Sequence, residues 1–380
     1  MARPVTVLLA LMKLDIGGAE THVVVLARHL KKMGYKVIMA SAGGRFEEEI
    51  ARYGIKHYRV PLHQHKISSL WRSIWALRNI VHTEKIDLIH AHARIPAFVT
   101  AVMRKPRNVH FITTAHFNFD YRYGLKYISQ WGEKTITVSE DIKEYLIKYF
   151  RVPAEKIIVI PNGIDTDAFS PFLKTNNDSP TADKNKDTIS IAHVSRLDGE
   201  LAGVALNLIA ASEHLSALAP AMRLAIVGDG NKRGEVERRA QAFNVRQGTE
   251  VVTMLGARTD VNKIMAKSDL VVGVSRVALE AMACAKPVLL AGPQGFGGLL
   301  DRQNLHFFQK DNFTARLSGK NTTVENLVSS LQEFLNRPVQ WRTDAGKHLR
   351  EFVKKEYSSL QMAQKVAQVY QDTLGKLLSS

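Results

Sequence analysis

The segment SDLVVGVSRVALEAMACAKPVLL at residues 268–290 decides the fold prediction. It contains two short apolar runs, Leu270–Gly273 and Pro287–Leu290, with a helical segment between them. One acid, Glu280, stands among the small and apolar residues of that helical segment. Ligands bind outside the carboxyl ends of the strands in an open α/β sheet, where an acid in the first helical turns can accept hydrogen bonds from a ribose. The segment predicts a strand–helix–strand unit, with Glu280 either as a ligand-binding acid or as an acid without a ligand.

The same alternation of apolar runs and helical patterns extends through the whole chain, which predicts βαβ units and mostly parallel sheets. Helical patterns include Glu20–Met33, Ser69–His82, Asp141–Phe150 and the final segment Leu360–Leu378. The glycines at 295–298 predict a flexible loop or a plain turn. The predicted strands are residues 5–11, 36–40, 56–60, 87–91, 110–114, 135–138, 157–160, 189–194, 223–227, 251–255, 270–273 and 287–290.

Length and composition indicate a globular chain with two domains. The chain has 380 residues, more than one compact core usually holds. It is 45% hydrophobic and 23% charged, which excludes a disordered protein. Residues 174–187 are polar and poor in apolar residues, and they separate two α/β halves. No apolar run approaches the length of about 20 residues that spans a bilayer, so no membrane-spanning helix is expected. The single cysteine fits a reducing cytoplasmic setting, which is the predicted location.

The net charge and the cysteine content limit the ligands, binding partners and cellular compartment that the sequence is compatible with. The single cysteine, Cys284, excludes an intrachain disulfide and a cysteine-rich metal site, and it fits a reducing compartment. The net charge is +16, with the larger basic excess in residues 1–170. Such a surface attracts anionic lipid or phosphorylated substrates, or it is simply a solvated basic surface. No nucleic-acid-binding module is recognisable, so nucleic acid is not a predicted partner.

Two motifs in the first half place glycines and a histidine after predicted strands. Gly17 and Gly18 open a helix, where backbone amides can approach a phosphate. They do not form the three-glycine dinucleotide fingerprint, which argues against a nicotinamide dehydrogenase. His116 ends the strand at 110–114 and can act on a hydroxyl group, or it is a structural histidine. His90 and His92 offer two imidazoles without a third ligand, so no metal is predicted.

An ordered set of short motifs covers most of the chain. The motifs are GGAE at 17–20, TTAH at 113–116, PNGID at 161–165, SRLD at 195–198, VGDG at 227–230, LG at 255–256, LEAMA at 279–283 and KPV at 286–288. Each motif is weak alone, but their agreement in number and order is not expected by chance. In this number and order they resemble the motifs of the family 4 retaining glycosyltransferases of bacterial type, which have the GT-B fold.

The resemblance implies two Rossmann-like α/β domains facing across a cleft, and a domain division follows from it. The first domain would bind the acceptor, and the second would bind a nucleoside-diphosphate-sugar donor. A last helix would pack back on the first domain. The predicted boundaries are residues 1–170 for the N-terminal domain, 171–188 for a polar linker, 189–356 for the C-terminal domain and 357–380 for the C-terminal helix.

The resemblance also implies roles for individual residues. The amides of Gly17 and Gly18 would approach the donor phosphates or the acceptor, and His116 would lie near the reacting sugar. Arg196 would neutralise the diphosphate, because a planar permanent cation suits phosphate oxygens. Glu280 would hold the donor ribose. The predicted catalytic residues are His116, Arg196 and Glu280; the predicted donor-binding residues are Gly17, Gly18, Arg196, Gly228, Arg276 and Glu280; no metal and no cofactor besides the donor are predicted.

Two positions depart from the family's donor-site pattern. The family usually places a lysine a few residues after the arginine, and Leu201 stands in that region here. It also often places an acid eight residues before Glu280, a position occupied by Val272. We hypothesise that Arg276, at the start of the same helical segment, replaces the missing lysine at the diphosphate. The alternative is that Arg276 is an ordinary exposed residue at a helix start.

Residues 70–78 mix tryptophan, aliphatic residues and arginine at helical spacing. Such a face can rest on an anionic membrane surface and reach a lipid-linked acceptor, or the stripe can be ordinary core. Peripheral contact with the inner face of the cell membrane is therefore one of two open interpretations. Basic residues close in sequence are Arg94, Arg104, Lys105 and Arg107.

The predicted activity is transfer of a hexosyl group from a nucleotide-sugar to a glycan or lipid-linked acceptor in cell-envelope polysaccharide or glycolipid synthesis, with retention of configuration. One alternative is a sugar-nucleotide epimerase of the same fold, for which no acids or bases could be assigned. Another is a non-catalytic donor-binding homologue, which the residues Val272 and Leu201 keep open.

Overall fold

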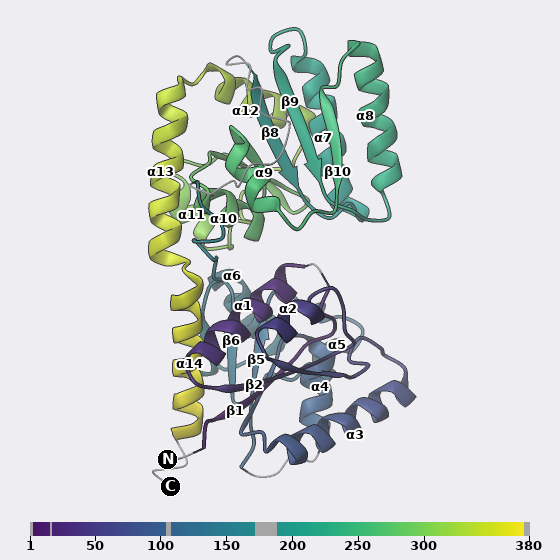
Figure 1. Cartoon of the computed structure of the whole chain (residues 1–380), viewed down its shortest axis with the longest axis vertical. Coiled ribbons are helices and arrows are strands. Elements are labelled where there is room, and N and C mark those ends of the chain that lie inside the picture. Colours follow the sequence, from purple (N-terminus) through teal and green to yellow (C-terminus); the bar gives the residue numbers. More distant parts are fainter. Residues whose placement is uncertain (1–2, 16, 104–107, 172–187, 376–380) are drawn as a thin grey trace. The chain divides into compact units, whose positions relative to one another are not determined.

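The computed structural model describes residues 3–15, 17–103, 108–171 and 188–375, which form two compact α/β units (Figure 1). Unit 1 comprises Met1–Gly163 and Ser359–Ser380, and unit 2 comprises Ile164–Ser358. Each unit has its own sheet with helices packed against it, so the prediction of two Rossmann-like α/β domains is confirmed. Most of the predicted polar linker, residues 172–187, lies outside the described residues.

Unit 1 contains a seven-stranded sheet in the order β3-β2-β1-β4-β5-β6-β7, and every neighbouring pair is parallel. Its strands are β1 (Thr6–Ala10), β2 (Lys36–Ser41), β3 (Lys56–Arg59), β4 (Leu88–Ala91), β5 (His110–Ala115), β6 (Lys134–Thr137) and β7 (Ile157–Val159). Its helices are α1 (Gly18–Lys32), α2 (Glu47–Arg52), α3 (Ile67–Glu84), α4 (Arg94–Val102), α5 (Leu125–Ile128), α6 (Glu140–Tyr145), a π-helix (Leu146–Phe150), a 3₁₀-helix (Ala154–Lys156) and α14 (Ser359–Gly375).

Both faces of this sheet are buried, as a parallel sheet requires. Val7 and Leu9 of β1 belong to the core cluster that contains residues of α1 and α14. Leu8 and Ala10, the alternate residues of the same strand, belong to a second cluster with residues of α3 and α4. Helix α14 is the last element of the chain and lies beside α1 in Figure 1, so sequence-distant segments complete the core of unit 1.

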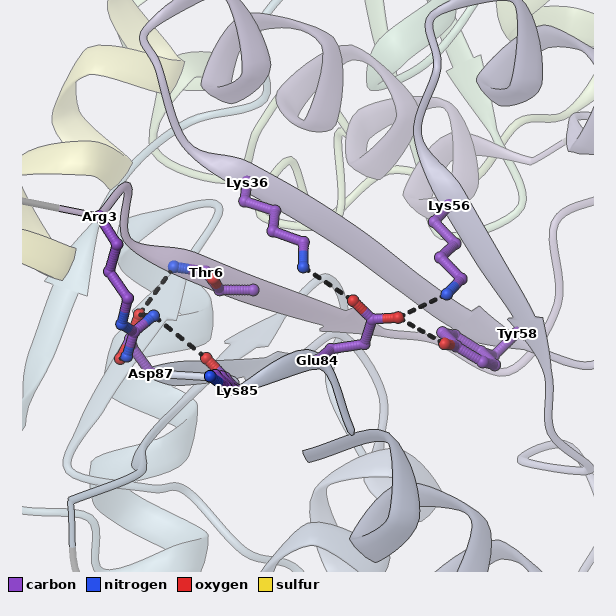
Figure 2. A network of polar contacts seen from close by, with 8 residues as sticks. All are labelled: Arg3, Thr6, Lys36, Lys56, Tyr58, Glu84, Lys85 and Asp87. Carbon is purple, nitrogen blue, oxygen red and sulfur yellow. Dashed lines mark hydrogen bonds and ion pairs between the residues drawn. The ribbon is translucent and has the colours of Figure 1, made fainter. Parts of the chain in front are cut away.

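A network of ion pairs fastens the end of α3 to the strands of unit 1 (Figure 2). Glu84, the last residue of α3, accepts hydrogen bonds from Lys36 at 2.8 Å, from Lys56 at 2.5 Å and from the hydroxyl of Tyr58 at 2.6 Å. These partners hold the pKa of the Glu84 carboxyl down at about 2. The network therefore favours an ionised Glu84 and anchors α3 to β2 and β3.

Unit 2 contains a six-stranded sheet in the order β10-β9-β8-β11-β12-β13. It is parallel except for β13, which runs antiparallel to β12. Its strands are β8 (Ile189–Val194), β9 (Met222–Val227), β10 (Val252–Gly256), β11 (Leu270–Gly273), β12 (Val288–Gly292) and β13 (Gly295–Leu299). Its helices are α7 (Gly199–Leu215), α8 (Arg233–Gln247), α9 (Val261–Lys267), α10 (Arg276–Ala283), α11 (Leu305–Gln309), α12 (Val324–Asn336) and α13 (Val339–Glu356).

The glycine-rich stretch at 295–298 is strand β13, so the prediction of a flexible loop or turn there was wrong. Close packing explains why glycines occupy this strand. A Cβ atom at Gly297 would lie 2.8 Å from the Phe308 ring and 2.9 Å from Leu290. The strand has glycines because its backbone approaches neighbouring side chains, and that reason is invisible in the local sequence.

The units divide after Gly163, whereas the sequence placed the first boundary at residue 170. Ile164 explains the earlier division. Its side chain is buried in a core cluster of unit 2, and its amide donates to the carbonyl of Tyr357 at 2.7 Å. Residues after Gly163 are thus already bound to unit 2, and the second crossing falls at Ser358–Ser359.

Candidate active site

The loops that follow β8 and β9 in unit 2 interlock at the carboxyl edge of the sheet. The Ser195 amide donates to the Val227 carbonyl at 3.0 Å, and the Leu197 amide donates to the Asp229 carbonyl at 2.9 Å. Gly228 has φ 152°, and a Cβ there would collide with the carbonyl oxygen of Ser195. Glycine at 228 is therefore needed for the two loops to touch, and the motifs SRLD and VGDG form one surface.

Arg196 lies exposed within this surface. Its guanidinium makes no hydrogen bond or ion pair with any described residue, so its charge remains available to an anion. Leu201, in the first turns of α7, is only partly buried. The chain therefore tolerates an apolar residue where the family usually carries a second cation.

Arg276 and Glu280 form an ion pair within α10, directly after the connection from β11. The Arg276 Nε lies 2.7 Å from the Glu280 Oε1, and the two side chains are only 12% and 10% exposed. Burial raises the pKa of Glu280, and the Arg276 charge opposes that rise. The alternative of an ordinary exposed Arg276 does not fit, because its side chain is largely covered and pairs with Glu280.

The connection between β11 and α10 consists of Val274 and Ser275 alone. Val272, eight residues before Glu280, lies inside β11, is fully buried and belongs to the main core cluster of unit 2. It pairs with His193 on β8 and with Leu289 on β12. The family's first acid has no counterpart here because this connection is too short to place a side chain of position 272 outside the sheet.

Strained backbone surrounds the start of α10. Ser275 has φ 53°, and its amide donates to the Phe313 carbonyl at 2.7 Å. The Asn312 side-chain amide donates to the Ser275 hydroxyl at 3.1 Å, and Asn312, Phe313 and Ala315 also have positive φ. Strain of this kind costs about 1–3 kcal/mol per residue and clusters at ligand sites. The segment 312–315 was missed from the sequence, which carries no glycine to signal positive φ.

In unit 1, Gly17 and Gly18 begin α1. The Gly17 carbonyl accepts hydrogen bonds from the amide and the hydroxyl of Thr21, at 2.9 and 2.8 Å. A Cβ at Gly18 would meet no described atom within 4 Å. Packing against the described residues therefore does not require glycine at 18.

His116 follows β5 and meets two other histidines that the sequence did not connect with it. Its Nε2 lies 3.2 Å from the Nδ1 of His92, which follows β4. The ring of His22, on α1, lies 4.9 Å from the His116 ring. Burial lowers the pKa of His116 to about 4 and that of His92 well below its usual range. His116 is therefore neutral at pH 7, not poised near neutrality as expected from sequence.

His90 and His193 are structural histidines. His90 is fully buried, with one ring nitrogen 2.7 Å from the Tyr370 hydroxyl and the other 2.7 Å from the Thr114 hydroxyl. The His193 Nδ1 lies 3.0 Å from the Val272 carbonyl oxygen. Burial lowers the pKa of His90 to about 3 and that of His193 to about 4. His90 thus belongs to the core, whereas His92 and His116 contact each other just after the carboxyl ends of β4 and β5.

Known proteins are similar to this chain in sequence and in fold. Residues 16–168 match the Glycosyltransferase Family 4 model, and residues 188–319 match the glycosyl transferases group 1 model. A phosphatidylinositol N-acetylglucosaminyltransferase subunit of Schizosaccharomyces pombe is 24% identical over 93% of this chain and 77% of its own. A Rickettsia africae glycosyltransferase structure has TM-score 0.74 at 19% identity, covering 98% of this chain and 99% of that one.

A further structural neighbour carries ligands. Anabaena HepE in complex with UDP and glucose has TM-score 0.71 at 18% identity, covering 96% of this chain and 99% of that one. The fold and the matches define an enzyme that transfers glycosyl groups. The chain belongs to the family 4 glycosyltransferases with the GT-B fold, which confirms the resemblance found in the sequence. The predicted nucleotide-sugar ligand agrees with the UDP complex of this neighbour.

Proposed function

We propose that the protein transfers a sugar from a UDP-sugar to a glycan or lipid-linked acceptor of the cell envelope, with retention of anomeric configuration. The buried Arg276–Glu280 pair after β11 carries this proposal, because it fixes an acid and a cation where open α/β sheets bind ligands. The HepE complex supports UDP as the nucleotide. The name of the S. pombe relative supports a lipid acceptor.

In this proposal the donor binds through unit 2. Glu280 accepts hydrogen bonds from the ribose, and Arg196 and Arg276 face the diphosphate. As the glycosidic bond breaks, the leaving diphosphate gains negative charge, and fixed cations and backbone amides lower that barrier. The amides near Gly228 belong to the same surface as Arg196. These groups supply the charge without a resident metal or cofactor.

The acceptor binds through unit 1. His116 is neutral at pH 7, so it acts as a hydrogen-bond partner of a sugar hydroxyl and not as a source of positive charge. Gly17 and Gly18 present backbone amides at the start of α1, where an anionic group is stabilised. A neutral imidazole and backbone amides at a helix start suit a hydroxyl or a phosphate of the incoming acceptor.

Contact with an anionic membrane surface is the second part of the proposal. Ile67, Trp71 and Trp75 follow one another every four residues along α3, and their exposed fractions are 74%, 59% and 66%. Arg78 lies over the Trp75 ring, 5.9 Å from its centroid. An exposed aromatic stripe beside arginines suits the interface of a bilayer with anionic lipids.

The other four basic residues named from the sequence add no support to this face. The Arg94 guanidinium donates to the Asp120 carbonyl and lies over the Phe119 ring, so it is engaged inside unit 1. Arg104, Lys105 and Arg107 lie outside the described residues. Within the described ranges, no helix is long and apolar enough to cross a bilayer. The proposed membrane contact therefore depends on α3.

A transfer assay tests the proposed activity. Radiolabelled UDP-glucose, UDP-galactose and UDP-N-acetylglucosamine are each incubated with the protein and a lipid extract. We expect label in an organic-soluble or polymeric product with one donor, and none with Glu280→Gln. Nuclear magnetic resonance of the product gives its anomeric configuration, which we expect to match that of the donor.

The other outcomes of this assay separate the alternatives. An altered nucleotide-sugar formed without any acceptor would replace the proposal with an epimerase. Tight UDP binding without any product, from every donor and extract tried, would favour the non-catalytic alternative.

Liposome flotation tests the membrane part. We expect binding to vesicles with anionic lipid, weak binding to neutral vesicles, and at least about a tenfold loss with Trp71→Ser/Trp75→Ser, because burying each indole at the interface is worth more than 1 kcal/mol. Leu218→Ser is a matched control in unit 2, since Leu218 is 71% exposed. Equal binding by the native protein and the double variant would contradict membrane contact through α3.

A further inference from the structure

Three histidines from separate elements of unit 1 meet at one point. His22 lies on α1, His92 directly follows β4, and His116 directly follows β5. One ring nitrogen of each lies within 4.8 Å of those of the other two. Parallel strands place their carboxyl ends along one edge, and the β4–β5 register ends with Ala91 opposite Thr113, so His92 and His116 both follow the sheet at that edge. This three-histidine cluster (His22, His92 and His116) has the ligand count of a metal site with one open position.

The distances fit a small tetrahedral ion. Zinc binds imidazole nitrogens at about 2.0–2.1 Å, so two nitrogens on one tetrahedral ion are about 3.3 Å apart. The His92 Nδ1 and the His116 Nε2 are 3.2 Å apart. The centroid of the His22 ring lies 4.9 Å from that of His116 and 6.1 Å from that of His92. A small movement of the His22 side chain would therefore bring its nitrogen to the third ligand position.

The surroundings also suit a bound cation of this type. His22 and His92 are buried, while His116 is partly exposed and leaves a path from solvent. The His92 Nε2 is buried and has no hydrogen-bond partner among the described residues. The ion binds His92 through the other ring nitrogen, Nδ1, so Nε2 is not a ligand of the proposed site.

We propose that His22, His92 and His116 bind one divalent transition-metal ion of the zinc class, with water in the fourth position. Three imidazoles without a carboxylate favour zinc, cobalt, nickel or copper over magnesium and calcium, which prefer oxygen ligands. The ion is not used in sugar transfer. Since it occupies His116, it inhibits transfer, and this second statement rests on the proposed function.

Binding is measured on metal-stripped native protein. Calorimetric titration with Zn²⁺ should give one equivalent that Mg²⁺ does not reproduce, and Co²⁺ should give the visible absorption of a tetrahedral site. His22→Asn, His92→Asn and His116→Asn should each weaken Zn²⁺ binding by more than about tenfold, because even outer-shell changes cost 10–100-fold. His65→Asn is the matched control, since His65 is exposed and outside the cluster.

Unchanged Zn²⁺ affinity in His22→Asn, or no stoichiometric binding by the native protein, would overturn the proposal. Zinc X-ray absorption of the native protein avoids variants that do not fold. Three imidazole ligands support the site, and fewer than three contradict it.

Transfer assays separate this proposal from the proposed function. Zn²⁺ should inhibit transfer, and a chelator should restore it. One equivalent bound by the three histidines without inhibition would uphold the metal site and contradict the acceptor-side role of His116.

Discussion

Unit 1 and unit 2 build their candidate sites in different ways at the carboxyl ends of their strands. Unit 2 places an acid and a cation four residues apart on one helix, and buries them together. Unit 1 gathers imidazoles from α1, β4 and β5, more than twenty residues apart in sequence. A local site can be read from spacing, whereas a distributed site exists only once the sheet has formed.

The largest expected effect is at Val272, the position where the family's first donor-site acid would stand but which is buried inside β11 here. Val272→Glu would put a carboxylate in the core between His193 and Leu289. We expect a loss of more than about 4 kcal/mol in the free energy of unfolding, because the charge is buried without a partner. Urea unfolding measures the loss. A variant with native stability and tighter donor binding would show that the acid can reach the ligand after all.

Arg276→Ala tests whether the local pair serves the donor. It leaves Glu280 buried without its cation and removes the proposed diphosphate contact, so we expect UDP affinity to fall about 10- to 100-fold, the value of a hydrogen bond to a charged group. Arg258→Ala is the matched control, because Arg258 pairs with Asp260 on the exposed surface of the same unit. Unchanged UDP affinity and turnover in Arg276→Ala would reject the replacement hypothesis.

Acid should affect unit 1 more than unit 2. Burial lowers the pKa values of His90 and His116 to about 3 and 4, and in unit 2 that of His193 to about 4. Between pH 6.5 and 4 these histidines bind protons in the unfolded chain but stay neutral in the folded chain. The free energy of unfolding therefore falls as the pH falls. The slope is about 1.4 kcal/mol per pH unit for each histidine.

Hydrogen exchange at pH 7 and pH 5 measures this effect region by region. We expect protection to fall further in β4 and β5 than in β8 and β11. His90→Gln should reduce the pH dependence in unit 1, and the exposed His65→Gln should leave it unchanged. Stability that stays flat from pH 7 to pH 5 would contradict neutral buried histidines.

The smallest expected effect is at Leu201. Leu201→Lys restores the family's second cation at a partly exposed position, so stability should change by less than about 0.5 kcal/mol. UDP affinity should rise about two- to fivefold, the scale of a solvated charge contact. Calorimetry at low and high salt checks both the gain and its screening. Unchanged UDP affinity would place residue 201 away from the diphosphate.

Much of the fold was predictable from the sequence, because apolar runs and helical patterns alternate regularly. The strands β1 to β12 lie close to their predicted ranges. Strand β13 was not predictable, because a run of glycines usually indicates a loop. Here the absence of a side chain at Gly297 lets the strand pack against Phe308. Tertiary packing, and not intrinsic propensity, makes that segment a strand.

The candidate sites follow the same rule. Glu280 was predicted from the resemblance to the family's donor motif, and Arg276 from its place at the start of the same helical segment. Their ion pair was not predicted, although residues four apart on a helix are neighbours. The strained segment at 312–315 was not, since the hydrogen bond from Ser275 to Phe313 is what holds it beside α10. His22 was missed because only the packed sheet shows which face of α1 meets His92 and His116.

Calorimetric binding of UDP to the native protein and to Glu280→Gln tests the proposed donor site most directly. We predict that the native protein binds UDP more tightly than uridine monophosphate, because Arg196 and Arg276 contact the second phosphate. Glu280→Gln should weaken UDP binding by about tenfold or more, through loss of a charged ribose contact. No binding of any nucleoside diphosphate by folded protein, or equal affinity in the variant, would contradict a donor site at Glu280.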